Sequence, residues 1–349
     1  MRYWSLLLTI LLGFTACMED GEGRSSLSTV PSSSGKIDEV VVVMDESKWA
    51  GDLGLALRVA VQEEYGLLPQ PEPSFDLRQI QPSGLNTILK RASSILIVGD
   101  TSNIGPTSLY MKQQMQRFND KIPASTFTIQ DPWATPQQVT FLYARTEAEL
   151  IELIKVQKDF IKKRLYKIES KKALNNAYAA RVNEDVTQQV KEQLKIDLKI
   201  PNSFRTVELN DTMLWIRQDL EGEVSVLMVY TTPYKDKAQF STEYAVACRN
   251  MMNLQFTTET EGSHAITDTI TGYLSKQMTV GGKEVIETRG LWRMTKNFLG
   301  GPFINYLMID EENQQIVVFD GMVFAPNFKK RKPVRRLEVL LQNAIGEEF

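Results

Sequence analysis

Few side chains in this sequence have the type and spacing that catalysis requires. His264 is the only histidine, so a zinc site built on two or three imidazoles is excluded, and any Ser-His-Asp or Cys-His arrangement must use this one ring. Its surroundings predict a loop and a surface histidine. Carboxylates can hydrolyse glycosidic bonds without histidine, and open α/β sheets place their sites at strand ends. The carboxylates near predicted strand ends are Asp45, Glu46, Asp100 and Asp131. Hydrolysis of glycan or peptidoglycan is therefore an alternative, although the sequence leans against an enzyme.

Two charged segments could bind ions or charged partners. Residues 310–312 carry three adjacent carboxylates, and oxygen-rich loops suit calcium, but neighbouring side chains at a hairpin tip point in different directions, so a solvated turn is favoured. The basic run at 329–336 could contact anionic headgroups or acidic polysaccharide. Because Pro333 fits the first turn of a helix, a solvated helix face with Arg335 and Arg336 in solvent is favoured there.

The densest cluster of unusual residue types lies between 289 and 303. The Gly-Gly-Pro sequence at 300–302 sets a sharp, rigid turn, and Trp292 and Phe303 could stack beside it as a platform for carbohydrate or peptide. The alternative, which is favoured, is that both rings fill the core. With the basic run, this cluster defines a candidate interaction surface: Arg289, Trp292, Gly300, Gly301, Pro302, Phe303, Lys329, Lys330 and Arg331.

No cofactor or metal site is predicted. The glycine-bearing loop at 99–105 follows a strand and could cradle a phosphate, but it matches neither the dinucleotide nor the P-loop spacing, so a plain turn is favoured. Cys248 lies in an apolar helical pattern, which predicts a buried structural thiol. A formal net charge of −3 gives no indication of nucleic acid as a partner.

The strongest chemical signal stands at the N-terminus. Cys17 ends an apolar run that follows a weakly basic start at Arg2 and closes on small residues, which is the layout of an export signal. The arrangement resembles a bacterial lipoprotein signal, although Phe14 stands where leucine is usual. The run is too short for a transmembrane anchor, and a plain signal cleaved near Ala16 is the alternative. Lipidation of Cys17 would anchor the mature chain in a bilayer through its acyl chains.

The chain after the signal is long enough for two domains. The acidic residues at 18–22 resemble an export tag for the outer face of the outer membrane, with a solvated linker as an equal alternative. The following segment is rich in serine and glycine and predicts a flexible tether. The expected organisation is a signal peptide at 1–16, the tether at 17–36, an N-terminal α/β domain with a long bracing helix at 37–180, and a C-terminal α+β domain at 181–349.

The elements that must position these residues follow a βαβαβ order and then an antiparallel one. Continuous β-branched runs favour buried strands, and apolar residues at helical spacing favour helices. The predicted strands are 39–44, 75–81, 94–98, 126–131, 138–144, 204–209, 213–218, 224–231, 277–280, 284–287, 304–309 and 316–324. The predicted helices are 51–65, 83–91, 147–170 (broken only at Gln157), 186–198, 242–254 and a last one that carries Val334 and Leu341. Gly281 and Gly282 predict a type I′ turn. The expected fold class is α+β (mixed α/β), with a βαβ-containing N-terminal part joined by a long helix to an antiparallel sheet with helices.

The sequence also resembles a known family. Residues 289–292, 300–303 and 321–326, with Lys330 and Arg331, are similar to the recurring pattern of a domain-of-unknown-function family of lipoproteins from Gram-negative gliding and gut bacteria. The resemblance covers roughly residues 37–345. It implies lipidation at Cys17 and a shared fold, and it implies no activity.

The expected function is that of an envelope lipoprotein of unknown biochemical activity, acting as a binding or assembly module. Its expected partners are the lipid bilayer, through Cys17, and an envelope protein or polysaccharide, with no nucleic acid. Its expected location is the cell envelope, in the outer membrane and facing either the periplasm or the surface. Carriage of a small molecule or lipid in an apolar cavity is left open.

Overall fold

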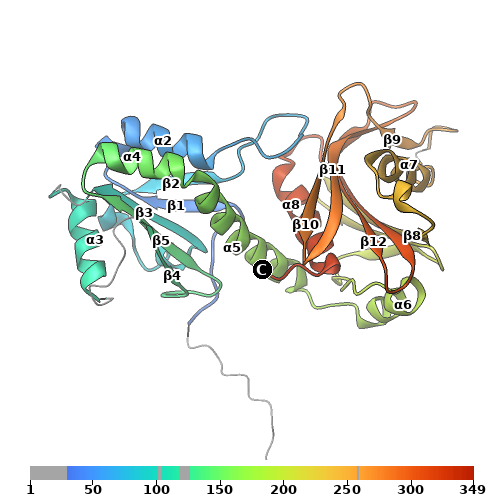
Figure 1. Cartoon of the computed structure of the whole chain (residues 1–349), viewed down its shortest axis with the longest axis horizontal. Helices are drawn as coiled ribbons and strands as arrows, with labels where there is room; N and C mark the ends of the chain where they lie inside the picture. Colours follow the sequence, from blue (N-terminus) through green and yellow to red (C-terminus); the bar gives the residue numbers. More distant parts are fainter. Residues whose placement is uncertain (1–29, 101–103, 118–125, 258) are drawn as a thin grey trace, which may run out of the picture.

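The computed structural model describes residues 30–100, 104–117, 126–257 and 259–349. Figure 1 shows two units side by side, each built on one sheet. We call residues 30–156 the N-terminal unit and residues 184–349 the C-terminal unit. The expected mixed α+β fold class is confirmed by these two sheets and the helices that cover them.

The N-terminal unit is a five-stranded sheet in the order β2-β1-β3-β5-β4, in which only β4 runs antiparallel. Its strands are β1 (Glu39–Val43), β2 (Asp76–Ile80), β3 (Ser94–Asp100), β4 (Thr126–Gln130) and β5 (Gln138–Ala144). Its helices are α1 (Glu46–Ala50), α2 (Asp52–Val61), α3 (Pro106–Arg117) and α4 (Glu147–Val156). Val40 to Val43 are fully buried because α2 and α4 cover one face of β1 while α3 lies on the other side of the sheet.

Several predicted helices have different limits in the structure, among them the helix predicted at 51–65, which runs from Asp52 to Val61. Residues 83–91 form two single 3₁₀ turns, Pro82–Gly84 and Leu89–Arg91, since proline and glycine so close together do not sustain an α-helix. The strong helical pattern at 147–170 is divided at Gln157, which caps α4, and α5 (Lys158–Tyr178) continues beyond it. The helix predicted at 186–198 ends four residues early because Lys195 is left-handed, with φ of 60°.

The C-terminal unit is an eight-stranded antiparallel sheet in the order β10-β11-β12-β13-β8-β7-β6, with the short β9 paired to β11. Its strands are β6 (Arg205–Leu209), β7 (Met213–Leu220), β8 (Glu223–Pro233), β9 (Ala265–Thr267), β10 (Tyr273–Val280), β11 (Lys283–Met294), β12 (Gly300–Asp310) and β13 (Gln315–Phe324). Its helices are α6 (Glu184–Leu194), α7 (Thr242–Asn253) and α8 (Arg331–Ile345), with one 3₁₀ turn at Lys237–Gln239. Gly281 and Gly282 both have positive φ between β10 and β11, which confirms the predicted tight turn.

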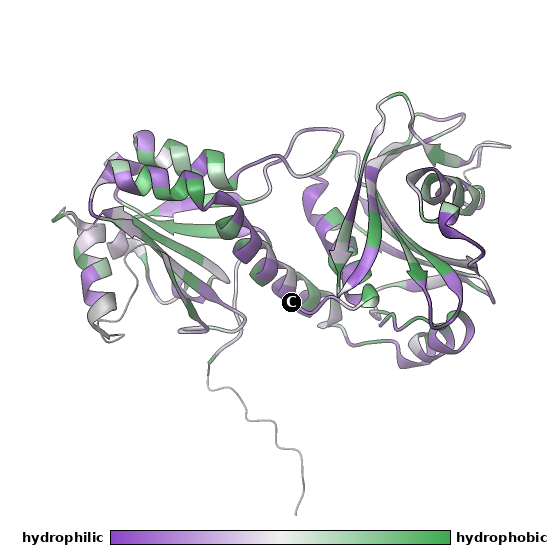
Figure 2. Ribbon diagram, in the orientation of Figure 1, coloured by the Kyte–Doolittle hydropathy of each residue, from purple (hydrophilic) through white to green (hydrophobic). Residues whose placement is uncertain are grey.

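The two units meet through α5, α8 and one loop. Helix α5 runs from the first sheet towards α8, and Figure 2 shows it largely hydrophilic along this stretch. Residues 62–75, which we call the crossing loop, connect α2 to β2. This loop places Tyr65 and Leu68 in the apolar cluster beneath α8 of the C-terminal unit. The contact is therefore partly a shared core.

Candidate functional site

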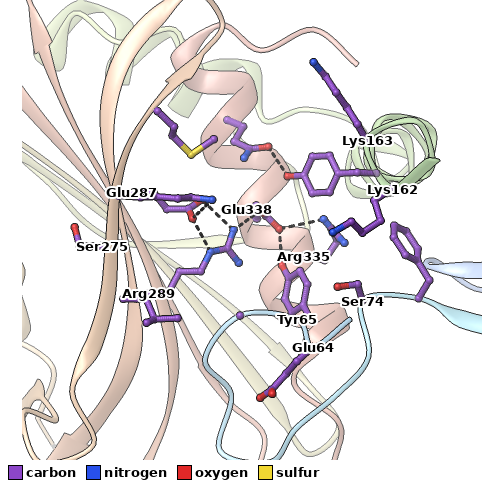
Figure 3. Close-up of a pocket in the computed structure, with 17 residues that line it drawn as sticks. Glu64, Tyr65, Ser74, Lys162, Lys163, Ser275, Glu287, Arg289, Arg335 and Glu338 are labelled. Carbon is purple, nitrogen blue, oxygen red and sulfur yellow. Dashed lines mark hydrogen bonds and ion pairs between the residues drawn. The ribbon is translucent and has the colours of Figure 1, made fainter. Parts of the chain in front are cut away.

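A pocket of about 490 Å³ opens where the two units meet. The crossing loop and α5 form its walls on one side, and β10, β11 and α8 form them on the other, as Figure 3 shows. Apolar and aromatic side chains of Phe75, Leu274 and Met278 line it together with charged groups. A concave site of this size at a unit boundary is the usual location of a ligand.

Arg289 forms the centre of the pocket wall on β11. Because side chains two apart on a strand share a face, Glu287 lies beside it, and Arg289 Nε and Nη2 donate to the two Glu287 oxygens at 3.0 Å each. Arg289 also donates to Glu338 of α8. The hydroxyl of Tyr306 donates to Glu287 at 2.8 Å. One guanidinium is therefore held between two carboxylates from different elements.

Arg335, which lies three residues before Glu338 on α8, also belongs to this network. Its guanidinium carbon lies 4.8 Å from the ring centre of Tyr65 and 4.4 Å from that of Tyr166, so it sits between two aromatic faces. Its Nη1 donates to Glu338 at 3.4 Å, and its Nε lies 3.3 Å from an oxygen of Asp38. The hydroxyl of Tyr65 donates a hydrogen bond to Glu338. The crossing loop, α5 and α8 are thus fixed to one another at this point.

A chain of hydrogen bonds crosses the base of the pocket. Tyr166 on α5 donates to the amide oxygen of Gln342 at 2.9 Å, and the amide nitrogen of Gln342 donates to Tyr306 at 2.9 Å. Tyr306 in turn donates to Glu287, so the chain runs from α5 through α8 to β11. Such a network holds the pocket walls in one arrangement before any ligand arrives.

The charges in the pocket keep both carboxylates ionised. Burial alone would raise the pKa of Glu287, but Arg289 and its hydrogen bonds lower it to about 2. Burial acts in the same direction on Glu338, and Arg289 and Arg335 again outweigh it, so the pKa of Glu338 is lowered. Burial raises the pKa of Tyr65 and Tyr166, with the negative charge of Glu338 adding to it. The tyrosines therefore stay neutral hydrogen-bond donors.

The rim of the pocket carries an excess of lysine. Lys276 on β10 is 62% exposed and its Nζ lies 3.3 Å from Glu287. Lys162 on α5 is paired with Glu63, whereas the exposed Lys163 beside it forms no ion pair among the described residues. Glu64 is the carboxylate that lines the pocket on the crossing loop. The rim therefore favours ligands with negative charge.

The predicted interaction surface is not one surface in the structure. Trp292 and Phe303 are 3% and 1% exposed and pack beneath α7, on the other side of the sheet from the pocket. Trp292 Nε1 donates to the Val323 carbonyl at 3.1 Å, and Arg249 lies 3.7 Å above the Phe303 ring. The favoured alternative, that both rings fill the core, is what the structure shows. The turn predicted at 300–302 is wrong, because Gly300, Gly301 and Pro302 lie on β12, where they pair with β11. Only Arg289 of this cluster reaches the pocket.

The expectation of a solvated helix face at 329–336 is wrong. Lys329 is exposed, but Arg331 and Arg335 are each 1% exposed, and Lys330 is also buried. The reason is pairing across the unit boundary, since Arg331 Nη2 lies 2.6 Å from Asp76 and its Nε 3.4 Å from Asp38. Part of a dense basic run therefore serves as an internal ionic contact, in which the buried guanidinium groups of Arg331 and Arg335 have acidic partners.

Arg336, which the same expectation placed in solvent, is half-buried. Its Nη1 lies 2.9 Å from Glu223 of β8. Both arginines of the predicted solvent-facing pair thus have carboxylate partners.

The carboxylates near the first sheet take structural roles. Asp45 accepts from the backbone N–H and hydroxyl of Thr107, at 3.1 and 2.7 Å, and so caps α3. Lys48 contacts Glu147 and lies 3.9 Å from Asp100. Asp131 accepts from Gln137 N at 2.6 Å within a turn, and Glu46 lies exposed in the first turn of α1. They do not meet as a pair in the pocket between the units.

The remaining predicted features are resolved as follows. Cys248 is 7% exposed, which confirms a buried thiol, and burial raises its pKa. Asp310 accepts from the backbone N–H and side chain of Asn313, as expected of a turn. His264 is half-buried beside β9. Within the described ranges, no three His, Cys, Asp or Glu side chains are placed to hold a metal ion. Cys17 lies outside the described residues, as does part of the 99–105 loop.

The pocket network itself was missed by sequence reasoning. Tyr65, Tyr166, Glu287 and Glu338 were not singled out, and Arg335 was placed in solvent. The only sequence signal is local: Glu287 and Arg289 are two apart on a strand, and Arg335 and Glu338 three apart on a helix, which puts each pair on one face. Nothing in either spacing shows that the two pairs meet.

Comparison with known proteins identifies both halves of the chain. Residues 33–178 match a domain of unknown function (DUF8532), and residues 183–343 match another (DUF4837). No curated protein matches the sequence. Among solved structures, the chain is similar to the Ran-binding protein Mog1p of Saccharomyces cerevisiae, at 16% identity over 42% of this chain and 86% of that one, with a TM-score of 0.25.

Human STARD10 is similar at 10% identity over 46% of this chain and 80% of that one, with a TM-score of 0.16. TM-scores this low do not establish a shared fold. The two domain matches together span most of the sequence and agree with the resemblance seen in its motifs. The chain therefore carries two domains of unknown function, DUF8532 at residues 33–178 and DUF4837 at residues 183–343.

Proposed function

We propose that this protein is a membrane-anchored binding module of the bacterial cell envelope, and that its ligand occupies the pocket between the two units. The observation that carries the proposal is the pocket itself. Elements from both units build it, and its charged groups are held in place by Arg289, Arg335 and their carboxylate partners. Because the pocket walls are already fixed, fewer side chains lose conformational freedom when a ligand binds, and the free-energy cost of binding is lower.

The anchor in this proposal is Cys17. It ends an apolar run at the N-terminus, and a serine-rich segment separates it from the first described residues. Two or three acyl chains on one cysteine hold a protein durably at a bilayer. In the part of the chain that the structure describes, no helix has the length and apolar character needed to cross a membrane.

Binding is favoured over hydrolysis by the state of the pocket carboxylates. A glycosidase needs one carboxylic acid that is protonated near neutral pH and one that is ionised. Glu287 and Glu338 both have lowered pKa values because Arg289 lies between them. Neither can therefore serve as the general acid, and the arrangement fits recognition better than proton transfer.

Lipidation is tested by metabolic labelling with a palmitate analogue in cells that express the full chain or Cys17→Ala. We expect label on the wild-type protein and release of the Cys17→Ala protein from the membrane fraction. Unlabelled wild-type protein in the soluble fraction would contradict lipid anchoring at Cys17. It would not contradict ligand binding in the pocket.

Binding is tested by recovery of partners from solubilised outer membranes. We expect one defined partner with the wild-type chain, and loss of that partner when Lys163 is changed to glutamate at the pocket rim. Lys167→Glu is the matched control, because Lys167 is exposed one helical turn further along α5 and does not line the pocket. Recovery of bulk lipid alone, or equal recovery by both variants, would contradict a pocket-bound partner.

A further inference from the structure

We propose that the partner of this pocket is an extended polypeptide segment that carries acidic and apolar residues together on one face, and that this segment pairs as an added strand with the free edge of β10. The inference rests on the proposed function, since it names the class of partner for the same binding site. Strand addition to an exposed sheet edge is a recurring mode of peptide recognition, in which main-chain hydrogen bonds provide affinity and alternate side chains provide specificity.

β10 is an edge strand with few of the usual protections of an edge, and Lys276 is its one charged side chain. It lies first in the sheet order, and no other strand of the described chain pairs with its far side. It is eight residues long, without proline or register shift. The opposite edge strand, β6, has five residues and a shift between Thr206 and Glu208, and the edges of the first sheet, β2 and β4, also have five. Short strands and bulges are the devices that discourage pairing, and β10 has neither.

The free edge of β10 forms part of the pocket wall. Leu274, Ser275 and Lys276 are consecutive, so their side chains alternate between the two faces of the sheet, yet all three line the pocket. The part of the strand that borders both faces of the sheet is its edge, where the main chain is exposed. All five residues from Tyr273 to Gln277 are also exposed, whereas a strand with one covered face would expose every second residue. A ligand in this pocket therefore has access to the main chain of β10.

The turn determines which main-chain groups are available. A two-residue turn at Gly281 and Gly282 makes Val280 and Lys283 a hydrogen-bonded pair, and bonded and non-bonded pairs alternate along an antiparallel ladder. Counting back from the turn, the even-numbered residues of β10 direct their N–H and C=O groups towards β11. Those of Ser275 and Gln277 therefore point away from β11, towards the site where an added strand would lie.

The side chains around this edge set the chemistry of the added strand. On the pocket side, Leu274 and Met278 are apolar, and Tyr166 presents a ring beyond them. Lys276 and Lys163 carry positive charge at the rim. Leu274, Lys276 and Met278 are two apart and share the pocket face of β10. A segment whose pocket-facing side chains are apolar beside Leu274 and Met278 and acidic beside the lysines satisfies both features, whereas a basic segment would be repelled.

The inference is tested with the full chain and two labelled peptides of about ten residues, the usual upper length of a strand. In one peptide, every second residue is glutamate or valine in turn, so that both share one face, and serine occupies the positions between them. In the other peptide, lysine replaces each glutamate. We expect the glutamate peptide to bind, as measured by fluorescence polarisation, at least about tenfold more tightly than the lysine peptide. Hydrogen exchange at the Ser275 and Gln277 amides should slow in the complex, because both amides would become donors to the peptide.

Gln277→Pro isolates the main-chain contribution. Proline removes the outward N–H and is tolerated on an edge strand where that N–H faces solvent, so the β10–β11 pairing should persist. We expect at least about a tenfold loss of affinity for the glutamate peptide. Gln277→Ala is the matched control, because it removes the same side chain, which donates to Glu284, and keeps the N–H. Its affinity should equal that of the wild type.

Three outcomes would overturn the inference: no binding of the glutamate peptide, equal affinity of the two peptides, or equal affinity of Gln277→Pro and Gln277→Ala when both unfold at the wild-type temperature. The proposed function can hold where this inference fails, and the membrane-partner experiment distinguishes the two. If Lys163→Glu abolishes recovery of the membrane partner and Gln277→Pro does not, the pocket binds a partner but strand addition is wrong.

Discussion

Glu72 accepts a hydrogen bond from the backbone N–H of Lys330 at 2.6 Å, across 258 residues of sequence. Its second oxygen lies 3.4 Å from the N–H of Arg331. A carboxylate of the crossing loop therefore occupies the N-terminus of α8, where a helix has unpaired amides and partial positive charge. Because α8 also carries Arg335 and Glu338, this contact links the position of the crossing loop to the geometry of the pocket.

Glu72→Ala should lower the free energy of unfolding by about 1–2 kcal/mol, since the loss of a helix cap has this cost. Urea denaturation of the full chain at neutral pH provides the measurement. Glu64→Ala, at an exposed position of the same loop, should change stability by less than about 0.5 kcal/mol. Equal effects of the two substitutions would show that Glu72 does not cap α8.

Arg335→Met should destabilise the chain by about 3–5 kcal/mol, because it leaves Asp38 and Glu338 as buried carboxylates without one of their cationic partners. Arg336→Met is the control on the same helix, since Arg336 is only half-buried. Thermal unfolding followed by circular dichroism distinguishes them. A loss for Arg335→Met no larger than that for Arg336→Met would contradict the role assigned to the buried network.

Glu287 should make stability depend on acid pH. Its pKa is about 2 in the folded chain against an ordinary value of 4.5, so the ionised form stabilises the fold. This contribution, about 3 kcal/mol, is complete above pH 4.5 and is lost as the pH falls from 4.5 towards 2. Glu287→Gln should therefore be less stable than wild type at pH 7 and should lose less stability between pH 4.5 and 2.

The Glu287 comparison is made by urea titration at each pH. Glu312→Gln is the control, because Glu312 is exposed in the turn between β12 and β13 and should leave the acid dependence close to that of the wild type. Parallel pH profiles for wild type and Glu287→Gln would contradict the pairing with Arg289.

Gly301→Ala should disrupt the C-terminal sheet. A Cβ at this position would lie 2.0 Å from the carbonyl oxygen of Val323 on the neighbouring strand, which is a backbone atom and cannot move aside cheaply. Overpacking in a well-packed core typically costs about 1–3 kcal/mol, and a backbone clash should reach or exceed the upper end. Gly84→Ala, where the nearest atom is a side chain at 3.6 Å, is the control. Equal melting temperatures for the two variants would contradict the close approach.

Local pattern was enough to predict most elements and the fold class. The continuous valines of β1 predicted a strand buried on both faces, and the two glycines at 281 and 282 predicted the β10–β11 turn. Gln157 was seen as a break in a helical pattern and proved to be the residue where α4 ends. These features depend on residues within a few positions of one another, which is the range over which side-chain periodicity and backbone preference act.

The pocket could not be predicted in this way, because its charged residues look like surface residues in sequence. Arg331 and Arg335 lie in a basic run that alone would be solvated, and they are buried only because Asp38 and Asp76 meet them from the other unit. Burial of a charge is a property of the pair, and the members of these pairs are separated by most of the chain.

The sequence by itself determined most of the strands and helices and the tight turn at Gly281 and Gly282, since each is encoded in adjacent residues. The lipoprotein-like signal at Cys17 stays a prediction. Only the tertiary structure decided that Trp292 fills a core, that the crossing loop reaches α8, and that the edge of β10 borders a pocket. Those outcomes depend on contacts between residues that are far apart in the sequence, and local pattern does not encode such contacts.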